Sequence, residues 1–417
     1  MVRKVEDWMT PRERVIAAVS HEEPDRVPID LGAMPSTGIT ALAYARLKAY
    51  LRMAGGTIRV YDVGQQLAEP EKGILELFHV DVIDLRRSLE PCGPGEGGWK
   101  GWRLPDGTEC EIPEWFNPEP DGRGGWVSRD PEGRALMRMP EGGYYFDTVY
   151  HPLEGARSTS ELDDYGWDDH RVSDACIRQL RRRAEHLHRN TDYAVMFFGA
   201  GSVHEWAQSL RGWKGWLMDL VGRKAMAEAL LDRMMEVLTY NLKRYVSALS
   251  GYVSIVGFGD DLGTQTGPQV SPRTYRDMLR HHHEALFGYV KRHSRLFVFL
   301  HSCGSIYELI PDLIDAGVDI LNPVQISARG MEPERLKKSF GEQITFWGGG
   351  VDTQRVFAFA SPEAVAGHVR ENVRVFAPGG GYVFNQVHNI QAKVPPENVV
   401  AAFEEAYEHG RYPISRM

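Results

Sequence analysis

Residues 296–304 read Leu-Phe-Val-Phe-Leu-His-Ser-Cys-Gly, an apolar run that changes abruptly to polar residues at 301. A nearly continuous apolar run is typical of a parallel strand that is covered on both faces, whereas a half-exposed strand alternates apolar and polar residues. The sequence therefore predicts a buried strand at 296–300 that delivers His301 and Cys303 to its carboxyl end.

Seven other short segments have the same character: residues 27–31, 81–85, 194–199, 253–257, 319–323, 344–347 and 382–384. Helical stretches such as 225–249 and 362–375 lie between them. About eight strands alternating with helices predict an α/β protein, a (β/α)8 TIM barrel, with a doubly wound open sheet as the alternative. No Gly-x-Gly-x-x-Gly motif follows an early strand, which weakens that alternative.

A segment rich in glycine, proline and tryptophan, at about 91–152, interrupts this pattern. Short β-prone pieces separated by turn residues predict an antiparallel β insertion in one barrel domain that spans residues 1–417. Before the first strand, Thr10, Pro11 and Glu13 form the signature of a helix start, with Thr10 as the N-cap and Glu13 as its capping-box partner.

Composition limits the classes of partner. The 417 residues carry a formal net charge of −9, which argues against nucleic-acid binding. No apolar run reaches the ~18 residues that cross a membrane, and residues 1–10 lack the apolar core of a signal peptide. The four cysteines show no paired spacing. We therefore expect a cytoplasmic protein with reduced thiols, and we leave a homodimer open.

Polar or glycine-rich residues follow five of the predicted strands, where barrel enzymes place their catalytic groups. On an extended segment His301 and Cys303 point to the same side, so an imidazole and a thiolate can hold one zinc ion. His388 follows the last strand and is the expected third ligand. A buried thiol beside a hydrogen-bonded histidine is the alternative without a metal.

Three acidic residues also follow strands and are candidate catalytic groups. Asp260 or Asp261 could ligate or orient a metal-bound group, or could instead cap the following segment or pair with Arg273. Glu205 could be a fourth ligand or an acid. Alternatively, it is a first-turn residue that the helix dipole favours.

Several stretches resemble the uroporphyrinogen decarboxylase superfamily, and within it the cobalamin-linked methyltransferase branch. The resemblance runs along nearly the whole chain, in MTPRERV at 9–15, PDRVP at 24–28, DDLGTQ at 260–265, HSCG at 301–304, NPVQ at 322–325, GGGVDT at 348–353 and HNIQ at 388–391. It implies a barrel, and it implies zinc bound by His301, Cys303 and a later cysteine, whose place His388 takes here. The decarboxylases carry arginines after their first strand, and residues 29–36 have none, although Asp84 matches their catalytic aspartate.

These observations predict a zinc-dependent methyltransferase. It would move a methyl group between a small methylated substrate, of methoxy or methylamine type, and a corrinoid. The chain has no Asp-x-His-x-x-Gly corrinoid signature, so the corrinoid would arrive on a separate partner protein. The alternatives are a methylcorrinoid:thiol methyltransferase, a metal-free decarboxylase of a tetrapyrrole or smaller acid, and a binding protein that has lost catalysis.

Overall fold

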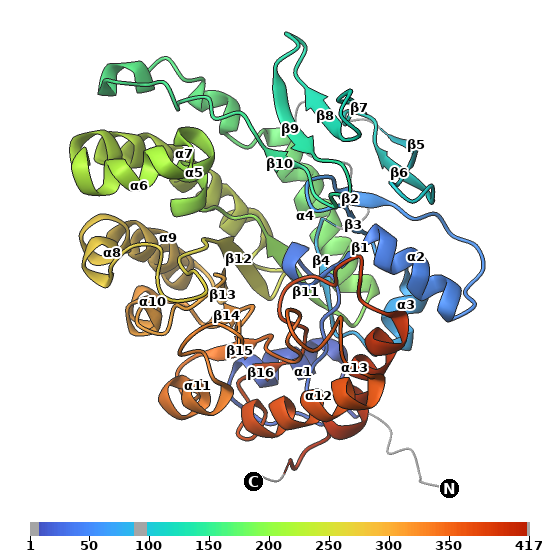
Figure 1. Ribbon diagram of the computed structural model, residues 1–417. Coiled ribbons are helices and arrows are strands. Elements are labelled where there is room, and N and C mark those ends of the chain that lie inside the picture. The colour runs from blue at the N-terminus through green and yellow to red at the C-terminus, as the bar shows by residue number, and fades with distance from the viewer. Residues whose placement is uncertain (1–7, 87–97, 415–417) are drawn as a thin grey trace, which may run out of the picture.

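The computed structural model describes residues 8–86 and 98–414, and its centre is a curled parallel sheet (Figure 1). Seven strands form it in the order β16-β15-β14-β13-β12-β11-β4, so each strand pairs with the next one along the barrel wall. Their bounds are β4 Val82–Asp84, β11 Ala194–Phe198, β12 Ile255–Gly259, β13 Phe297–His301, β14 Ile320–Asn322, β15 Thr345–Trp347 and β16 Tyr382–Val383.

The segment at 27–30 closes this sheet into a barrel. The backbone N–H of Phe384 donates to Pro28, and that of Asp30 donates back to Phe384, at 2.8 and 2.9 Å. On the other side the N–H of Asp81 donates to Ile29 at 2.8 Å. All eight predicted strand segments therefore lie in the barrel wall, and the predicted (β/α)8 fold is confirmed.

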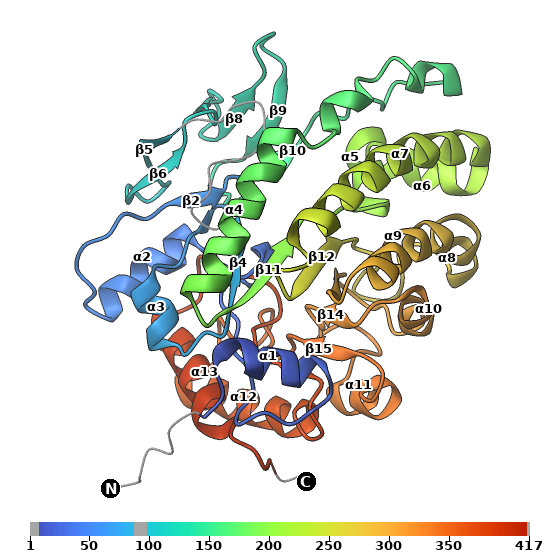
Figure 2. The same ribbon diagram turned by 180° about the vertical axis from the view of Figure 1, so that it is seen from behind.

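Helices surround the sheet, as expected for parallel strands covered on both faces (Figures 1 and 2). Their bounds are α1 Pro11–Val19, α2 Ala41–Tyr50, α3 Lys72–Leu77, α4 Asp174–Asn190, α5 His204–Arg211, α6 Trp213–Gly222, α7 Lys224–Leu249, α8 Pro272–Met278, α9 Arg280–His293, α10 Ile310–Ala316, α11 Pro333–Phe340, α12 Pro362–Phe376 and α13 Pro396–His409. Within residues 8–86 and 98–414, none of these helices combines the length and apolarity needed to cross a membrane.

Alternation along each strand divides the core in two. A cluster inside the barrel takes side chains from every strand: Val82, Ala194, Met196, Ile255, Phe299, Ile320, Trp347 and Val383. The residues between them, such as Val298 and Leu300 on β13, pack outward against the helices. A residue two positions beyond an interior side chain therefore also faces the barrel interior, as long as the strand stays extended.

Helix α1 covers the end of the barrel away from the insertion (Figure 2). Its residues Val15, Ala18 and Val19 belong to the interior cluster. Thr10 accepts from the N–H of Glu13, and the Glu13 carboxylate accepts from the N–H of Thr10, so the predicted capping box is present. Helix α1 covers one end of the barrel with apolar side chains. The other end, at the carboxyl ends of the strands, is where polar side chains can form a site.

The segment between β4 and α4 forms antiparallel β structure beside the barrel, as predicted (Figure 1). Strands β5 Trp99–Arg103 and β6 Glu109–Pro113 make a hairpin. A second sheet has the order β10-β9-β8-β7, with bounds β7 Pro118–Pro120, β8 Trp126–Arg129, β9 Ala135–Met139 and β10 Asp147–Thr148. A small sheet of β1 Ile39–Thr40, β2 Val60–Asp62 and β3 Leu67–Ala68 lies between insertion and barrel.

Candidate functional site

The carboxyl ends of the barrel strands open into a pocket of about 610 Å³. The pocket volume falls in the range of small-molecule sites in proteins, about 300–1,000 Å³. The described residues that line it are Met34, Pro35, Ser36, Gln65, His170, Phe198, Gly199, Gly201, Ser202, Glu205, Trp206, Val237, Leu238, Asn241, Gly259, Asp261, His301 and His388.

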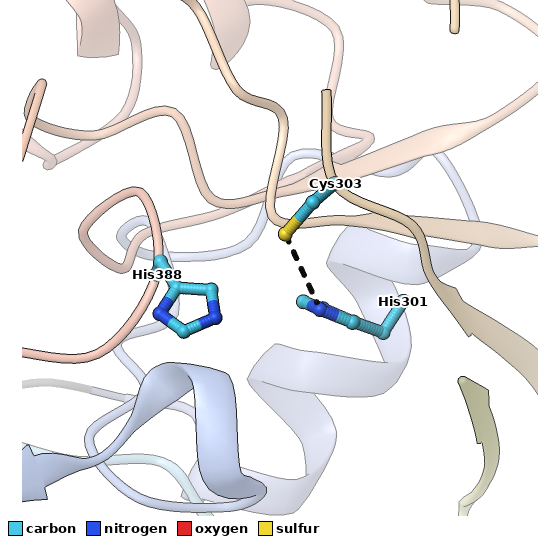
Figure 3. Close-up of side chains that lie close together, drawn as sticks. All are labelled: His301, Cys303 and His388. Atoms are coloured by element: carbon cyan, nitrogen blue, oxygen red, sulfur yellow. Dashed lines mark hydrogen bonds between the residues drawn. The ribbon is translucent and has the colours of Figure 1, made fainter. Parts of the chain in front are cut away.

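Three predicted metal ligands meet at this pocket (Figure 3). One nitrogen of His301, the sulfur of Cys303 and one nitrogen of His388 all lie within 4.8 Å of one another. The sulfur is 3.5 Å from His301 Nε2, and the two imidazole centroids are 5.9 Å apart. His388 comes from the loop after β16, where its backbone φ of 65° turns the chain. The structure thus brings together residues that are far apart in the sequence.

Strand alternation explains why His301 points inward. Phe299 belongs to the interior cluster, and His301 is two residues further along β13. Beyond the strand end, the backbone N–H of Cys303 donates to Asp261 Oδ1 at 2.7 Å, and this bond holds the loop toward the pocket. The same carboxylate oxygen lies 3.6 Å from His301 Nε2. Asp261 is therefore part of the cluster around the three candidate ligands.

Asn322 sets the orientation and the tautomer of the His301 imidazole. The amide Nδ2 of Asn322 donates to the carbonyl of Trp347 at 2.9 Å, so its Oδ1 faces the imidazole. His301 Nδ1–H must then donate to this oxygen, at 2.7 Å, and Ser36 Oγ donates to it as well, at 2.8 Å. The proton on Nδ1 leaves Nε2 with its lone pair directed at Cys303. Partners of this kind fix the tautomer of metal-binding histidines.

Burial shifts the pKa of two of the candidate ligands. It raises the pKa of the Cys303 thiol well above its ordinary value, and the charges of Asp261 and Glu205 add to the effect. The pKa of His388 is lowered to about 4, mainly by burial, and a proton gained by His301 would act in the same direction. The imidazole of His388 is therefore neutral near pH 7 and keeps a free lone pair.

Glu205 lies in the first turn of α5 and lines the pocket. Its pKa is raised to about 8, mainly by burial and in addition by the charges of Asp261 and Asp260. A carboxyl group in such surroundings holds its proton at neutral pH and can act as a general acid. The first-turn position of Glu205 is confirmed, whereas its role as a fourth ligand or as an acid stays a prediction.

Asp260 lies outside the pocket, although we expected a catalytic role for it. Its carboxylate accepts from the N–H groups of Val203, His204 and Glu205 at 2.7 to 2.9 Å, and from His283 Nε2 at 2.7 Å. Burial alone would raise the pKa of Asp260, but these donors, His283 above all, hold it below its usual value.

The alternation of side chains along β12 explains why Asp261 lines the pocket and Asp260 does not. Asp261 is an even number of positions from Ile255, which faces the barrel interior, so Asp261 faces inward too. Asp260 alternates with it and lies on the same side as Val256 and Phe258, which face the helices. Asp260 therefore caps α5 from behind the pocket. Arg273 pairs with Asp277 at 3.7 Å, so the expected alternative partner of the acidic pair is engaged elsewhere.

The insertion reaches the loop that carries His388, which the sequence reasoning missed. Tyr145 Oη donates to Asn389 Oδ1 at 3.2 Å, and Asn389 Nδ2 donates to Gln65 Oε1 at 2.7 Å. Gln391 also bonds to Tyr145. Asn389, which follows His388 in the sequence, is therefore bonded to Tyr145 of the insertion and to Gln65, and these bonds restrain the loop that carries His388.

The ionisable lining of the pocket is acidic. Among the described lining residues, Asp261 supplies a carboxylate and Glu205 a protonated carboxyl group, and there is no lysine or arginine. Met34, Phe198, Trp206, Val237 and Leu238 supply apolar walls. Such a pocket suits a small, largely apolar molecule and repels a substrate that carries several carboxylates.

The fold and this strand-end pocket define a TIM-barrel protein whose candidate site lies at the carboxyl ends of the strands. The uroporphyrinogen decarboxylase family matches residues 174–409, more than half of the sequence, and the chain belongs to that family. The family resemblance expected from the sequence motifs is thereby confirmed.

Two individual proteins illustrate how far this chain has diverged. A uroporphyrinogen decarboxylase of Azoarcus sp. strain BH72 is 32% identical over 81 residues, which are 19% of this chain and 22% of that protein. The chain thus matches less than a quarter of that relative. The structure of a methyltransferase from Methanosarcina mazei is similar with a TM-score of 0.56 over 96% of this chain and 99% of that chain, at 16% identity. This second likeness is one of fold.

Proposed function

We propose that the protein is a zinc-dependent methyltransferase that moves a methyl group from a small methoxy or methylamine-type substrate to the corrinoid of a partner protein. The observation that carries this proposal is the convergence of His301, Cys303 and His388 within 4.8 Å at the barrel mouth. The fold likeness to a protein described as a methyltransferase is compatible with it.

The three side chains fit zinc by their chemistry. Zinc accepts mixed imidazole and thiolate ligands, and catalytic zinc sites often have three protein ligands and one open position. His301 presents Nε2 because Asn322 occupies its other nitrogen. A zinc ion at this place would supply Lewis acidity toward the heteroatom that carries the methyl group.

The residues around the candidate ligands account for the rest of the reaction. The apolar walls formed by Met34, Phe198 and Leu238 can hold the substrate and exclude water. When the methyl group leaves for the corrinoid, the substrate heteroatom must gain a proton. The protonated Glu205 carboxyl lines the same pocket and is placed to supply this proton.

A decarboxylase that acts on a tetrapyrrole is the main alternative within the family. Its substrate carries several carboxylates, which need cationic partners. The described lining of the barrel-mouth pocket contains Glu205 and Asp261 without lysine or arginine, and it therefore favours the methyl-transfer proposal.

Metal analysis of the purified 417-residue chain tests the proposal. We expect about one zinc per chain, lost in Cys303→Ala and in His388→Ala. Cys176→Ala is the matched control, because this cysteine is buried on α4, away from the pocket. Cobalt(II) substitution adds an independent readout, since thiolate-to-cobalt absorption should disappear in Cys303→Ala. Zinc absent from the wild-type chain, or retained in both variants, would remove the basis of the proposal.

Turnover is tested separately with free cob(I)alamin as the methyl acceptor. Methoxyarenes and methylamines are offered as donors, and methylcobalamin is followed by its visible absorption. We expect methylation that a strong chelator stops. Carbon dioxide release from a carboxylated substrate in the presence of the chelator would instead identify a decarboxylase.

A further inference from the structure

The backbone of His388, the third candidate ligand, is held in an uncommon conformation. Its φ of 65° lies in the left-handed region, which a residue other than glycine keeps only where its surroundings hold it. The backbone N–H of Val387 donates to the carbonyl of Val351 at 3.0 Å, and that of Ile390 donates to the carbonyl of Gly38 at 2.9 Å. These bonds fix the backbone on both sides of His388, so the orientation of the imidazole depends on the partners of its side chain.

Asn389 is a partner of that imidazole. The side chains of Asn389 and His388 form a hydrogen bond, which partly opposes the lowering of the His388 pKa. A bond of this kind has a ring N–H as the donor and the amide oxygen of Asn389 as the acceptor. One ring nitrogen of His388 then carries the proton and the other keeps its lone pair, as in the bond between His301 and Asn322. Asn389 is fully buried.

A chain of hydrogen bonds that begins at Asp62 sets the orientation of the Asn389 amide. Asp62 accepts from the backbone N–H of Gln65 at 2.9 Å and from Gln65 Nε2 at 3.4 Å. Gln65 Oε1 is therefore turned toward Asn389, and it accepts from Asn389 Nδ2 at 2.7 Å. A half-turn of the Asn389 amide would place its oxygen against Gln65 Oε1, so the oxygen stays on the other side.

The insertion holds that other side. Tyr145 lies between β9 and β10, and its Oη donates to Asn389 Oδ1 at 3.2 Å. Gln391 Nε2 bonds to both Tyr145 Oη and Asn389 Oδ1. The backbone N–H of Phe146 donates to the carbonyl of Gly64 at 2.8 Å, so the insertion is also fixed next to the segment that carries Gln65. The Asn389 amide is thus held from the barrel and from the insertion.

We propose that Asn389 is a positioning residue for His388 and that Tyr145 keeps Asn389 in place, so that the insertion completes the candidate metal centre from outside the barrel. The inference rests on the proposed function, because it takes His388 as a metal ligand. It goes beyond that function by giving the insertion a role at the site. Loss of a partner that orients a metal-binding histidine weakens metal binding by about 10–100-fold.

The metal affinity of the 417-residue chain tests the inference. Tyr145→Phe removes a hydroxyl and keeps the ring, so this variant should fold even if Asn389→Ala does not. We expect zinc affinity, measured in competition with a chromogenic chelator, to fall by about 2–10-fold in Tyr145→Phe, the net effect of one hydrogen bond. It should fall by about 10–100-fold in Asn389→Ala.

Cobalt(II) gives a spectroscopic signature of the ligand geometry. Its ligand-field bands should shift in Tyr145→Phe and in Asn389→Ala, and a loss of stability alone would not shift them. Tyr150→Phe is the matched control, because the hydroxyl of Tyr150 bonds to Arg134 within the insertion. This variant should keep both the affinity and the spectrum of the wild type.

A second measurement needs no metal. In metal-free chain labelled with nitrogen-15 histidine, two-bond proton–nitrogen correlations separate the two neutral tautomers of an imidazole, and His388→Ala assigns the signal. We expect a single tautomer of His388 in the wild type and in Tyr150→Phe, and a mixture in Asn389→Ala.

The two measurements separate failure of the inference from failure of the proposed function. A wild-type chain without zinc would refute the proposed function, and the tautomer of His388 would still decide whether Asn389 positions it. Zinc binding and cobalt bands that are unchanged in Tyr145→Phe and Asn389→Ala would overturn the inference, as would a tautomer mixture in the wild type.

Discussion

Replacement of Asp260 by alanine removes the carboxylate that caps α5 from within the core. Asp260 is 1% exposed, and its two oxygens accept hydrogen bonds from three backbone N–H groups, from Ser202 Oγ and from His283. The alanine side chain has no acceptor atom, so these donors lose their hydrogen-bond partner. The expected effect is a loss of global stability together with a displaced Glu205.

The size of the loss follows from those hydrogen bonds. A buried donor that loses its partner costs about 1–3 kcal/mol, and hydrogen bonds to a charged group are at the upper end. The costs are not additive, because the first turn of α5 can relax, so we expect about 3–5 kcal/mol for Asp260→Ala. Asp260→Asn keeps one acceptor oxygen, and His283 can accept from the new amide. Only the N–H of Val203 then loses its partner, at about 1–3 kcal/mol.

Urea unfolding followed by circular dichroism measures both variants against the wild type. Asp277→Ala is the matched control, because this aspartate is partly exposed and pairs with Arg273 at 3.7 Å; its loss should cost less than about 1 kcal/mol. A loss below about 1 kcal/mol for Asp260→Ala, or equal losses for alanine and asparagine, would refute the reasoning.

Three further predictions follow from the same region. The pKa of Glu205 is about 8 in the folded protein against an ordinary 4.5, so the metal-free protein should lose stability as the pH rises between these values. Glu205→Gln should remove this slope in urea unfolding measured across that pH range, and an unchanged slope would contradict the assignment. Asn322→Leu removes the acceptor for His301 Nδ1–H and should weaken zinc binding by about 10–100-fold in competition with a chromogenic chelator. Gly199 has φ of 110° and lies against Arg86, so Gly199→Ala should cost about 1–3 kcal/mol in the same unfolding assay; an unchanged urea midpoint would count against this.

The barrel and the convergence of the candidate ligands could be predicted because both depend on local patterns. Apolar runs with polar ends mark the strands, and closure of the barrel brings strand ends to one mouth. His301 and Cys303 share a face because they are two residues apart, and His388 follows the last strand. These inferences need no knowledge of how individual loops turn.

The roles of Asp260 and Asp261 could have been separated by the same reasoning, but only once the inward-facing residues of β12 were identified. Residues 255–259 are Ile-Val-Gly-Phe-Gly, with no polar side chain among them, so this stretch does not indicate which alternate residues face the barrel interior. The structure identifies Ile255 as interior, and Asp261 follows with the same parity. A buried carboxylate that caps the helix of the preceding unit cannot be distinguished from a catalytic one by its position after a strand.

Contacts between distant segments lay beyond prediction. Asn322 was recognised as part of a family motif, but its hydrogen bonds to His301 and Trp347 depend on the pairing of three strands. The contact of Tyr145 with Asn389 depends on how the insertion packs on the barrel. Such packing is decided by tertiary contacts that leave no periodic signal in the sequence.

The way the barrel closes also affects when its site can form. The strand segment at residue 29 pairs with residue 384, so during synthesis it must wait until residue 384 has emerged. Contacts between such distant positions form slowly, because a very long loop must be ordered first. His388 follows the closing residue 384 by only four positions. A ribosome-bound chain that stops before residue 384 would therefore contain His301 and Cys303 in a barrel that has not yet closed. Metal binding would then mark the last step of folding. Metal uptake by ribosome-bound chains of increasing length would show when this step occurs.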